Sequence, residues 1–305
     1  MAPKRRAIER RAPAKINLSL RLLGVRPDGY HELRTIFQSI ALHDTLTVRL
    51  ERGPFRLECD DPTCPADRTN LVWRAAEQLW TASGRRGDPR DVAVHLTKRI
   101  PMRAGLGGGS SDAAAALIVM AKLWRVDGER VLDVARSLGA DVPYFLEGGT
   151  VLGLDRGDLL FPLIDAPAAW VSLVVPGFGV SAADAYEWWD GTRRRGRTAL
   201  PQAERRGLMN DLQPPVAKRH PQIARIVRSL ERSGARHTAM SGSGPAVFGL
   251  FDRRTDADRA LQALDEPRCR TFRTRTVNRA AYQRLAGIAA HRIDLPFAPR
   301  GFGHS

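Results

Sequence analysis

The sequence has few cysteines and no long hydrophobic run, and these absences exclude several classes of protein. Its three cysteines (Cys59, Cys64 and Cys269) are too few and too scattered for a disulfide framework, and no second Cys or His pair accompanies them as a zinc site would need. No apolar run approaches the roughly 20 residues of a transmembrane helix. The Arg-rich residues 1–14 contain no hydrophobic segment, unlike a secretory signal. We therefore expect a cytoplasmic protein with no membrane partner.

Lysine is also scarce, so arginine supplies most of the formal net charge of +15. A basic balance permits nucleic-acid binding, and a basic RNA- or DNA-binding protein with salt-dependent affinity is one hypothesis. Much of the excess charge, however, lies in three short stretches, at residues 1–11, 193–197 and 268–279. We favour the interpretation that a basic surface attracts anionic small substrates, and we expect no nucleic-acid partner.

The most informative segment is residues 101–112, which read PMRAGLGGGSSD and run into four alanines. Glycines let backbone N–H groups approach a ligand closely, and the start of a helix attracts anions, so the segment predicts a phosphate site. It differs from the Walker motif because Ser110 stands where that motif needs lysine, and it does not fit G-x-G-x-x-G. A plain helix-capping loop is the alternative, but such loops do not run into an alanine-rich helix behind paired serines.

The remaining periodicity predicts an α+β protein, because strands and helices interleave without strict βαβ repetition. In the first half, strands are expected at residues 14–22, 36–42, 45–50 and 92–96, and helices at 70–81, 112–124 and 129–138. In the second half, strands are expected at residues 148–153, 170–175, 246–251 and 270–277, and helices at 181–189, 221–233 and 257–264. In the first strand Lys15, Asn17 and Ser19 share one face, as in a half-buried strand. Residues 190–207 are polar and aperiodic, which indicates a mobile surface segment.

Three segments together resemble the GHMP kinase superfamily in their order and spacing: PAKINL at residues 13–18, the glycine loop, and SGSGP at 241–245. The resemblance extends over about residues 12–277. It implies a two-domain GHMP kinase fold, with an N-terminal ATP-binding domain of the ribosomal protein S5 domain 2-like type and a C-terminal ferredoxin-like α/β sandwich domain. The implied limits are a basic tail at 1–11, the two domains at 12–157 and 158–287, and a C-terminal tail at 288–305.

Further motifs resemble one subfamily of these kinases. They are PDGYHEL at residues 27–33, GADVP at 139–143, and the triple glycine that precedes Ser110 and Ser111. Members of this subfamily use ATP and Mg²⁺ to phosphorylate the 2-hydroxyl of 4-diphosphocytidyl-2-C-methyl-D-erythritol in the non-mevalonate isoprenoid pathway. The implied partner is thus a small-molecule cytidyl diphosphate substrate, bound by a monomer or weak homodimer. The alternative within the superfamily is a small-molecule kinase of the homoserine or mevalonate type.

The resemblance also assigns roles to residues. Asp141 is the expected catalytic base and Lys15 its paired lysine, which suits phosphoryl transfer, where a carboxylate takes the acceptor proton and a cation steadies the transferring group. No protein metal ligand is assigned. The ATP-binding residues implied are Asn70, Lys98, Pro101, Ala104, Gly105, Leu106, Gly107, Gly108, Gly109, Ser110 and Ser111. The substrate-binding residues implied are Asn17, Tyr30, His31, Tyr186, Gly242 and Ser243. Ala182 departs from the threonine expected beside Tyr186, which puts one substrate contact in doubt.

Overall fold

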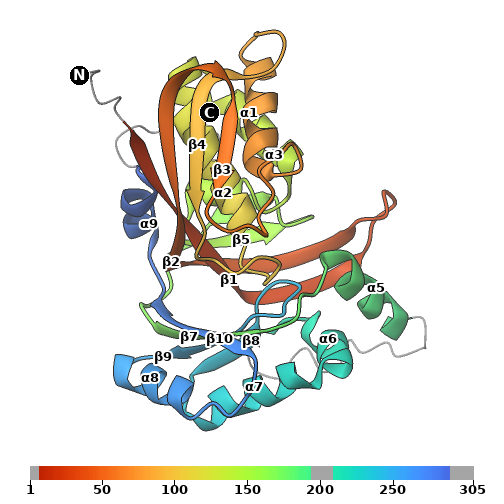
Figure 1. The fold of residues 1–305 in the computed structure, drawn as a ribbon. Coiled ribbons are helices and arrows are strands. Elements are labelled where there is room, and N and C mark those ends of the chain that lie inside the picture. The colour runs from red at the N-terminus through yellow and green to blue at the C-terminus, as the bar shows by residue number, and fades with distance from the viewer. Residues whose placement is uncertain (1–6, 194–208, 289–305) are drawn as a thin grey trace, which may run out of the picture.

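A computed structural model of the chain describes residues 7–193 and 209–288, and their strands form two β-sheets (Figure 1). The first sheet has six strands in the described residues, in the order β3-β4-β2-β5-β6, with β1 paired to β2. These strands are β1 (Ile8–Val25), β2 (His31–Pro54), β3 (Arg56–Cys59), β4 (Arg90–Thr97), β5 (Thr150–Leu154) and β6 (Leu159–Pro162). All neighbours pair antiparallel except β3 and β4.

The second sheet has four antiparallel strands in the described residues, in the order β10-β7-β9-β8. They are β7 (Trp170–Pro176), β8 (His237–Met240), β9 (Val247–Phe251) and β10 (Cys269–Arg275). The first sheet thus ends at Pro162 and the second begins at Trp170.

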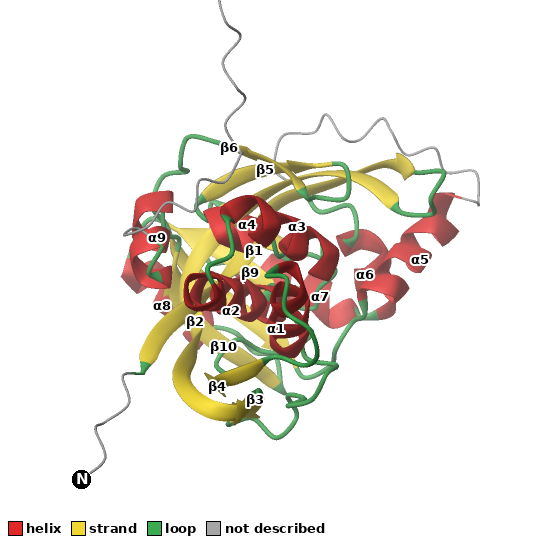
Figure 2. Cartoon of the chain, turned by 90° about the horizontal axis from the view of Figure 1, so that it is seen from above, coloured by secondary structure: helices red, strands yellow, loops and turns green. Residues whose placement is uncertain are grey.

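The helices divide between the two sheets, and those of the first sheet group together over its strands when seen from above (Figure 2). That group is α1 (Leu71–Ala82), α2 (Gly108–Trp124), α3 (Gly128–Leu138) and α4 (Tyr144–Glu147). On the second sheet pack α7 (Pro221–Arg232) and α8 (Arg254–Gln262), and α6 (Gln213–Arg219) packs on α7. Helix α5 (Ala182–Arg193) packs on α6 and lies beside the β1–β2 hairpin (Figure 1). A last helix, α9 (Arg279–Ala286), packs against β1. Both β6 and α9 fall within residues 158–287, yet they pack with the first sheet.

The middle of strand β1, residues 12–20, is buried on both faces, whereas its alternating pattern predicts only half burial. Ala14, Ile16 and Leu18 share a hydrophobic cluster with Val171 and Phe248 of the second sheet. On the opposite face, the polar side chains that alternate with them are also covered, and Lys15 is only 3% exposed. The strand runs between the two layers in Figure 1, so it packs against the second sheet while it belongs to the first.

Strand β2 is continuous through residues 43 and 44, where the sequence predicts two separate strands. The prediction is wrong because Asp44 is fully buried inside the strand, and a buried aspartate is rare unless it is paired. Six elements in the described residues were not expected from the sequence: β3, α4, β6, β8, α6 and α9. Each has only four to eight residues, which is too short for a clear period.

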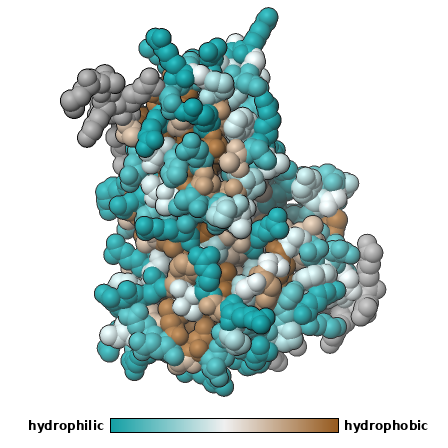
Figure 3. Space-filling view, viewed as in Figure 1, coloured by the Kyte–Doolittle hydropathy of each residue, from teal (hydrophilic) through white to brown (hydrophobic). Residues whose placement is uncertain are grey.

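None of the helices in the described part of the chain is long and apolar enough to cross a membrane. The face shown in Figure 3 is mostly hydrophilic at its outer edges, with hydrophobic residues gathered toward the middle. Residues 190–193 of the segment expected to be mobile continue α5, and residues 194–207 lie outside the described ranges.

Candidate active site

The glycine loop leads directly into α2, as its sequence predicts, and its backbone leaves no room for side chains at two positions. Gly105 has a φ of +78°, and a Cβ built there would lie 2.1 Å from the Ser241 carbonyl oxygen. Gly107, with a φ of +70°, precedes α2, and its Cβ would lie 2.6 Å from the Phe145 ring. The N-cap residue of α2 is Gly107, which has no side chain to bond the first N–H groups of the helix. The first N–H groups of this helix are therefore available to an anionic ligand.

The loop is held between β1 and the turn at residues 241–245. On one side the Lys15 N–H donates to the Leu106 carbonyl oxygen at 3.0 Å, and the Ser111 hydroxyl donates to the Pro13 carbonyl oxygen at 2.8 Å. On the other side the Ser241 hydroxyl donates to the Gly105 carbonyl oxygen at 2.9 Å. The three segments that carry the family resemblance thus meet at one place in the structure.

Lys15 and Asp141 meet beside this loop although 126 positions separate them in the sequence. The Lys15 Nζ lies 3.4 Å from the Asp141 Oδ2 and donates to the Asn17 Oδ1 at 2.7 Å. The Asn17 amide in turn donates to the Thr35 hydroxyl at 2.7 Å, which donates to the Ser19 carbonyl oxygen. The Lys15 side chain is 4% exposed and that of Asp141 is 34% exposed. A buried, oriented ammonium therefore faces a carboxylate that a ligand can reach.

The turn at residues 241–245 also approaches this pair. A Cβ built at Gly242 would lie 3.2 Å from the Lys15 Nζ. The side chain of Asn210 holds the turn, because its amide donates to the carbonyl oxygens of Met240 and Gly242, both at 2.7 Å. Asn210 is buried and was not identified from the sequence. The backbone around Gly242 and Ser243 is thereby fixed next to the Lys15 ammonium.

At the other end of the site, His31 and Tyr186 come together as stacked rings, with centroids 4.6 Å apart and planes 28° apart. The His31 Nε2 lies 2.9 Å from the Asp190 Oδ1, and the Trp189 ring meets the imidazole edge-on at 5.6 Å. Burial, and then the charge of Asp141, raise the pKa of the Tyr186 phenol to about 12. The sequence did not identify Trp189 and Asp190, although they follow Tyr186 by three and four positions on α5, the spacing of one helix face.

Tyr30 lies apart from this stack. Its side chain is 58% exposed, and the Arg156 guanidinium lies 5.3 Å from its ring centroid. Within the described residues, Tyr30 makes no ring contact with His31 or Tyr186. The two tyrosines expected to enclose a base are therefore not stacked on each other, and their role stays a prediction.

The two residues expected near adenine already have partners in the protein. The Asn70 side chain caps α1 by accepting from the Val72 N–H at 2.9 Å, and its amide donates to the Pro65 carbonyl oxygen at 2.6 Å. The Lys98 ammonium is paired with Asp44 and Asp112. Their contact with a nucleotide remains a prediction from the resemblance.

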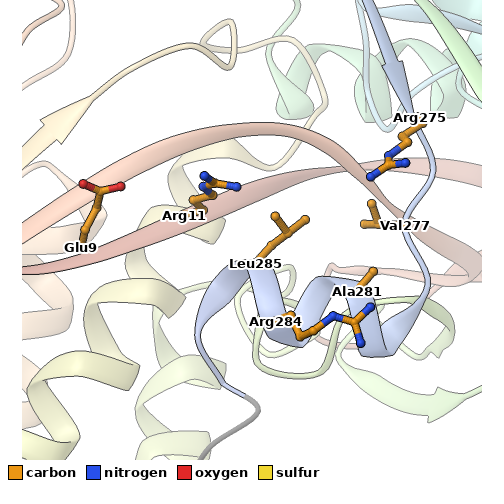
Figure 4. A pocket seen from close by; sticks show the side chains of 7 residues that line it. All are labelled: Glu9, Arg11, Arg275, Val277, Ala281, Arg284 and Leu285. Carbon is orange, nitrogen blue, oxygen red and sulfur yellow. The ribbon is translucent and has the colours of Figure 1, made fainter.

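An arginine-lined pocket of about 430 Å³ lies elsewhere, where β1, the end of β10 and α9 come together (Figure 4). Its lining residues are Glu9, Arg11, Arg275, Val277, Ala281, Arg284 and Leu285. It shares no residue with the loop, the Lys15–Asp141 pair or the ring stack. Part of the basic residue run at 268–279 therefore borders this pocket.

Family models match two parts of this chain. The model described as "GHMP kinases N terminal domain" matches residues 70–149, which include the glycine loop and Asp141. The model described as "GHMP kinases C terminal" matches residues 193–267.

Similar proteins cover nearly the whole chain. A protein of Solibacter usitatus named 4-diphosphocytidyl-2-C-methyl-D-erythritol kinase is 42% identical over 300 residues, which is 90% of each chain. A protein of the same name from Moorella thermoacetica is 41% identical and covers 87% of this chain and 98% of its own.

Among solved structures, a crystal structure of 4-(cytidine 5'-diphospho)-2C-methyl-D-erythritol kinase matches with a TM-score of 0.72 and 36% identity, covering 88% of this chain and 99% of that one. A homoserine kinase from Cytophaga hutchinsonii shares the fold, with a TM-score of 0.66 at 18% identity over 91% of this chain and 96% of its own. These matches confirm the two-domain GHMP kinase fold that the sequence predicts.

Proposed function

Since this chain belongs to the 4-diphosphocytidyl-2-C-methyl-D-erythritol kinase family of the GHMP kinases, we propose that it transfers the γ-phosphoryl group of ATP to the 2-hydroxyl of that cytidyl substrate. It is an ATP-dependent small-molecule kinase. The observation that carries the assignment of the reacting groups is the pairing of Lys15 with Asp141 beside the glycine loop.

In the proposed reaction the Asp141 carboxylate accepts the proton of the 2-hydroxyl as the hydroxyl oxygen bonds to the γ-phosphorus, while the bond from that phosphorus to the β,γ-bridging oxygen breaks and ADP leaves. The Lys15 ammonium, held by Asn17, stabilises negative charge on the transferring group. The open N–H groups at the start of α2 bind the phosphate oxygens of ATP, and the backbone of Gly242 and Ser243 closes the opposite side. Each group acts mainly by position, which is what phosphoryl transfer requires.

Mg²⁺ would reach this site bound to ATP. The described residues contain no group of three or more His, Cys, Asp or Glu side chains placed to hold a metal ion. This fits Mg²⁺, which keeps several waters and binds through substrate phosphates rather than through a protein cage. When present, the ion neutralises phosphate charge. The residues of this chain supply the loop and the Lys15 ammonium.

The cytidine end of the substrate would bind at His31 and Tyr186. A neutral pyrimidine gains stacking energy on an aromatic ring, and an imidazole nitrogen or a backbone group can contact the base edge. Tyr30, which is exposed, would cover the other face of the base. We place the reaction in the cytoplasm, because the three cysteines are free, as a reducing compartment favours.

The test is ATP consumption by the purified protein with Mg²⁺ and 4-diphosphocytidyl-2-C-methyl-D-erythritol. Asp141→Asn should lower kcat by about 10² to 10⁴-fold because it removes the general base. The matched control is Asp133→Asn, an exposed carboxylate on α3 that should leave kcat unchanged. Homoserine and mevalonate serve as comparison acceptors.

Turnover of the cytidyl substrate alone, together with loss in Asp141→Asn, supports both the substrate and the base. Turnover of homoserine or mevalonate instead would replace the substrate assignment and keep the kinase. Full activity in Asp141→Asn would remove this aspartate from the mechanism.

A further inference from the structure

Three charged side chains are buried together at the base of the glycine loop. The Lys98 Nζ donates to the Asp44 Oδ2 and, at 2.6 Å, to the Asp112 Oδ2. Asp44 is fully buried and Asp112 is 3% exposed, while the Lys98 side chain is 5% exposed. Asp44 comes from β2, Lys98 follows β4, and Asp112 lies in α2. The cluster therefore joins three elements that are far apart in sequence.

The same cluster holds the backbone that enters the loop. The Asp44 Oδ1 accepts hydrogen bonds from the N–H groups of Arg99, at 2.5 Å, and Ile100, at 2.8 Å. The loop begins with the next residue. Both oxygens of this one carboxylate are thus in use, one on the entering backbone and one on Lys98.

The exit of the loop rests on the cluster as well. Asp112 is the fifth residue of α2, whose first N–H groups form the phosphate site. A Cβ built at Gly108, the first residue of α2, would lie 3.5 Å from the Asp44 Oδ2 and 3.0 Å from the Ile100 Cγ2. The start of the helix therefore lies directly against the groups that hold the loop entrance.

We propose that Asp44 and Asp112 are positioning residues for the nucleotide, which hold the two ends of the phosphate loop at a fixed spacing through the Lys98 ammonium. The proposal rests on the ATP-dependent kinase activity proposed above. Its consequence is that the affinity for ATP depends on the cluster, while the affinity for the acceptor does not.

The charge of the cluster is consistent with such a role. Hydrophobic residues at three buried positions would avoid the cost of removing charges from water, so buried ion pairs are not explained by stability alone. Here one ammonium serves two carboxylates, and the Asp112 Oδ1 has no hydrogen-bond partner among the described residues. Burial raises the pKa of the Asp112 carboxyl to about 7, with Lys98 opposing the rise and Asp44 adding to it. Burial lowers the pKa of Lys98, but the two carboxylates outweigh it and leave that pKa above its ordinary value.

The test uses Asp112→Ala and Asp112→Asn in the full chain. In Asp112→Ala, the Kd for a non-hydrolysable ATP analogue with Mg²⁺, measured by calorimetry, should rise about tenfold or more, because small displacements of positioned groups have large effects. The KM for ATP should rise in parallel, while the KM for the cytidyl acceptor should stay within about twofold, because α2 does not carry the groups proposed to bind the base. Asp112→Asn keeps an amide oxygen for Lys98 and should restore most of the affinity for the analogue. Asp133→Ala on α3 is the matched control.

An unchanged Kd for the analogue in folded Asp112→Ala would overturn the proposal. So would an equal rise of both KM values with a lower melting temperature, which is the signature of a purely structural role. If Asp112→Ala does not fold, Asp44→Asn decides the question, because its Oδ1 can keep the bonds to Arg99 and Ile100 while its amide cannot accept from Lys98. An unchanged Kd in Asp44→Asn also overturns the proposal. The ATP analogue binds without the cytidyl acceptor, so this Kd stays informative even if the proposed acceptor is wrong. An error in the acceptor would instead appear in the turnover assay of the proposed function.

Discussion

The candidate site has a phosphate end, formed mainly by backbone, and a base end, formed by side chains. The phosphate end consists of backbone: glycines whose missing side chains let the loop, β1 and the turn at 241–245 touch, with a buried charge cluster beneath. The base end consists of side chains on α5 and on the start of β2, where Tyr30 is more than half exposed. A backbone site has one geometry, whereas a side-chain site can adjust its rotamers. We therefore expect ATP binding and base binding to respond to different substitutions.

Among the changes that test this comparison, the largest effect should follow a substitution of Lys15, which lies between the two ends. Lys15→Met keeps the length of the buried side chain and removes its charge. The kcat should fall by about 10² to 10³-fold, because a preorganised cation no longer stabilises the transferring group. The KM values for both substrates, measured by steady-state kinetics, should change little. A fall in kcat of less than threefold would contradict the role of Lys15.

At the phosphate end, Gly105→Ala should damage the fold of the loop. Its Cβ would meet the Ser241 carbonyl oxygen, and the positive φ strains any other residue. We expect a loss of about 1–3 kcal/mol of stability, read as a lower melting temperature. Gly109→Ala is the matched control, because its Cβ would meet only the Leu71 Cδ1, at an ordinary 3.7 Å. Equal melting temperatures for the two variants would mean that the loop can move away from the turn.

At the base end, Tyr186→Ala should raise the KM for the cytidyl substrate about tenfold, since stacking contributes roughly 1–3 kcal/mol per base. Tyr30→Ala should also raise the KM for the cytidyl substrate, but by less, because this ring is exposed. The KM for ATP should stay constant in both variants. A rise in the KM for ATP would show that the two ends are coupled, against the comparison drawn above.

A pH-dependent difference in stability is expected at Asp112. The pKa of its carboxyl is raised from 3.8 to about 7 by burial in the folded state, so the protonated form favours folding. That contribution is complete below pH 3.8 and is lost as the pH rises through about 7. The amide in Asp112→Asn does not ionise, so this variant keeps its stability while wild type becomes less stable. The melting temperature of the variant relative to wild type should therefore increase between pH 5 and 8, by about 2–4 °C for each kcal/mol of unfolding free energy that wild type loses. A difference that is constant with pH would contradict the raised pKa.

The sequence predicted the local features of this protein well. The strand that contains Lys15, the glycine loop and the helix behind it follow from patterns within a few residues, such as alternation and glycine followed by alanine. The start of that helix was predicted at residue 112, whereas α2 begins four residues earlier, at Gly108. The family resemblance implied that Lys15 and Asp141 would meet, which no spacing could show. Short elements such as β3 and α6 were missed because four to seven residues do not define a period.

Most contacts between segments that are distant in the chain could not be predicted from the sequence. Asp44 lies between the two strands predicted at residues 36–42 and 45–50, and nothing near it in the sequence indicated that it would be buried in an ion pair. Lys98 stands out in a lysine-poor chain, yet nothing in its neighbourhood identifies Asp44 and Asp112 as partners. The pairing of His31 with Asp190 depends on how α5 lies beside the β1–β2 hairpin, which is a property of the folded chain (Figure 1).

The return of α9 to β1 has a practical consequence for protein engineering. A Cβ built at Gly287, just after α9, would lie 2.7 Å from the Arg10 Nε, near the start of β1. The two ends of the described fold are therefore neighbours, on the opposite side of the molecule from α5 in Figure 1. A short peptide linking residues near these ends would allow circular permutation, with new termini placed in an exposed turn that carries no candidate site residue, such as residues 84–87. Labels attached at this shared corner would leave the entrance to the base end open.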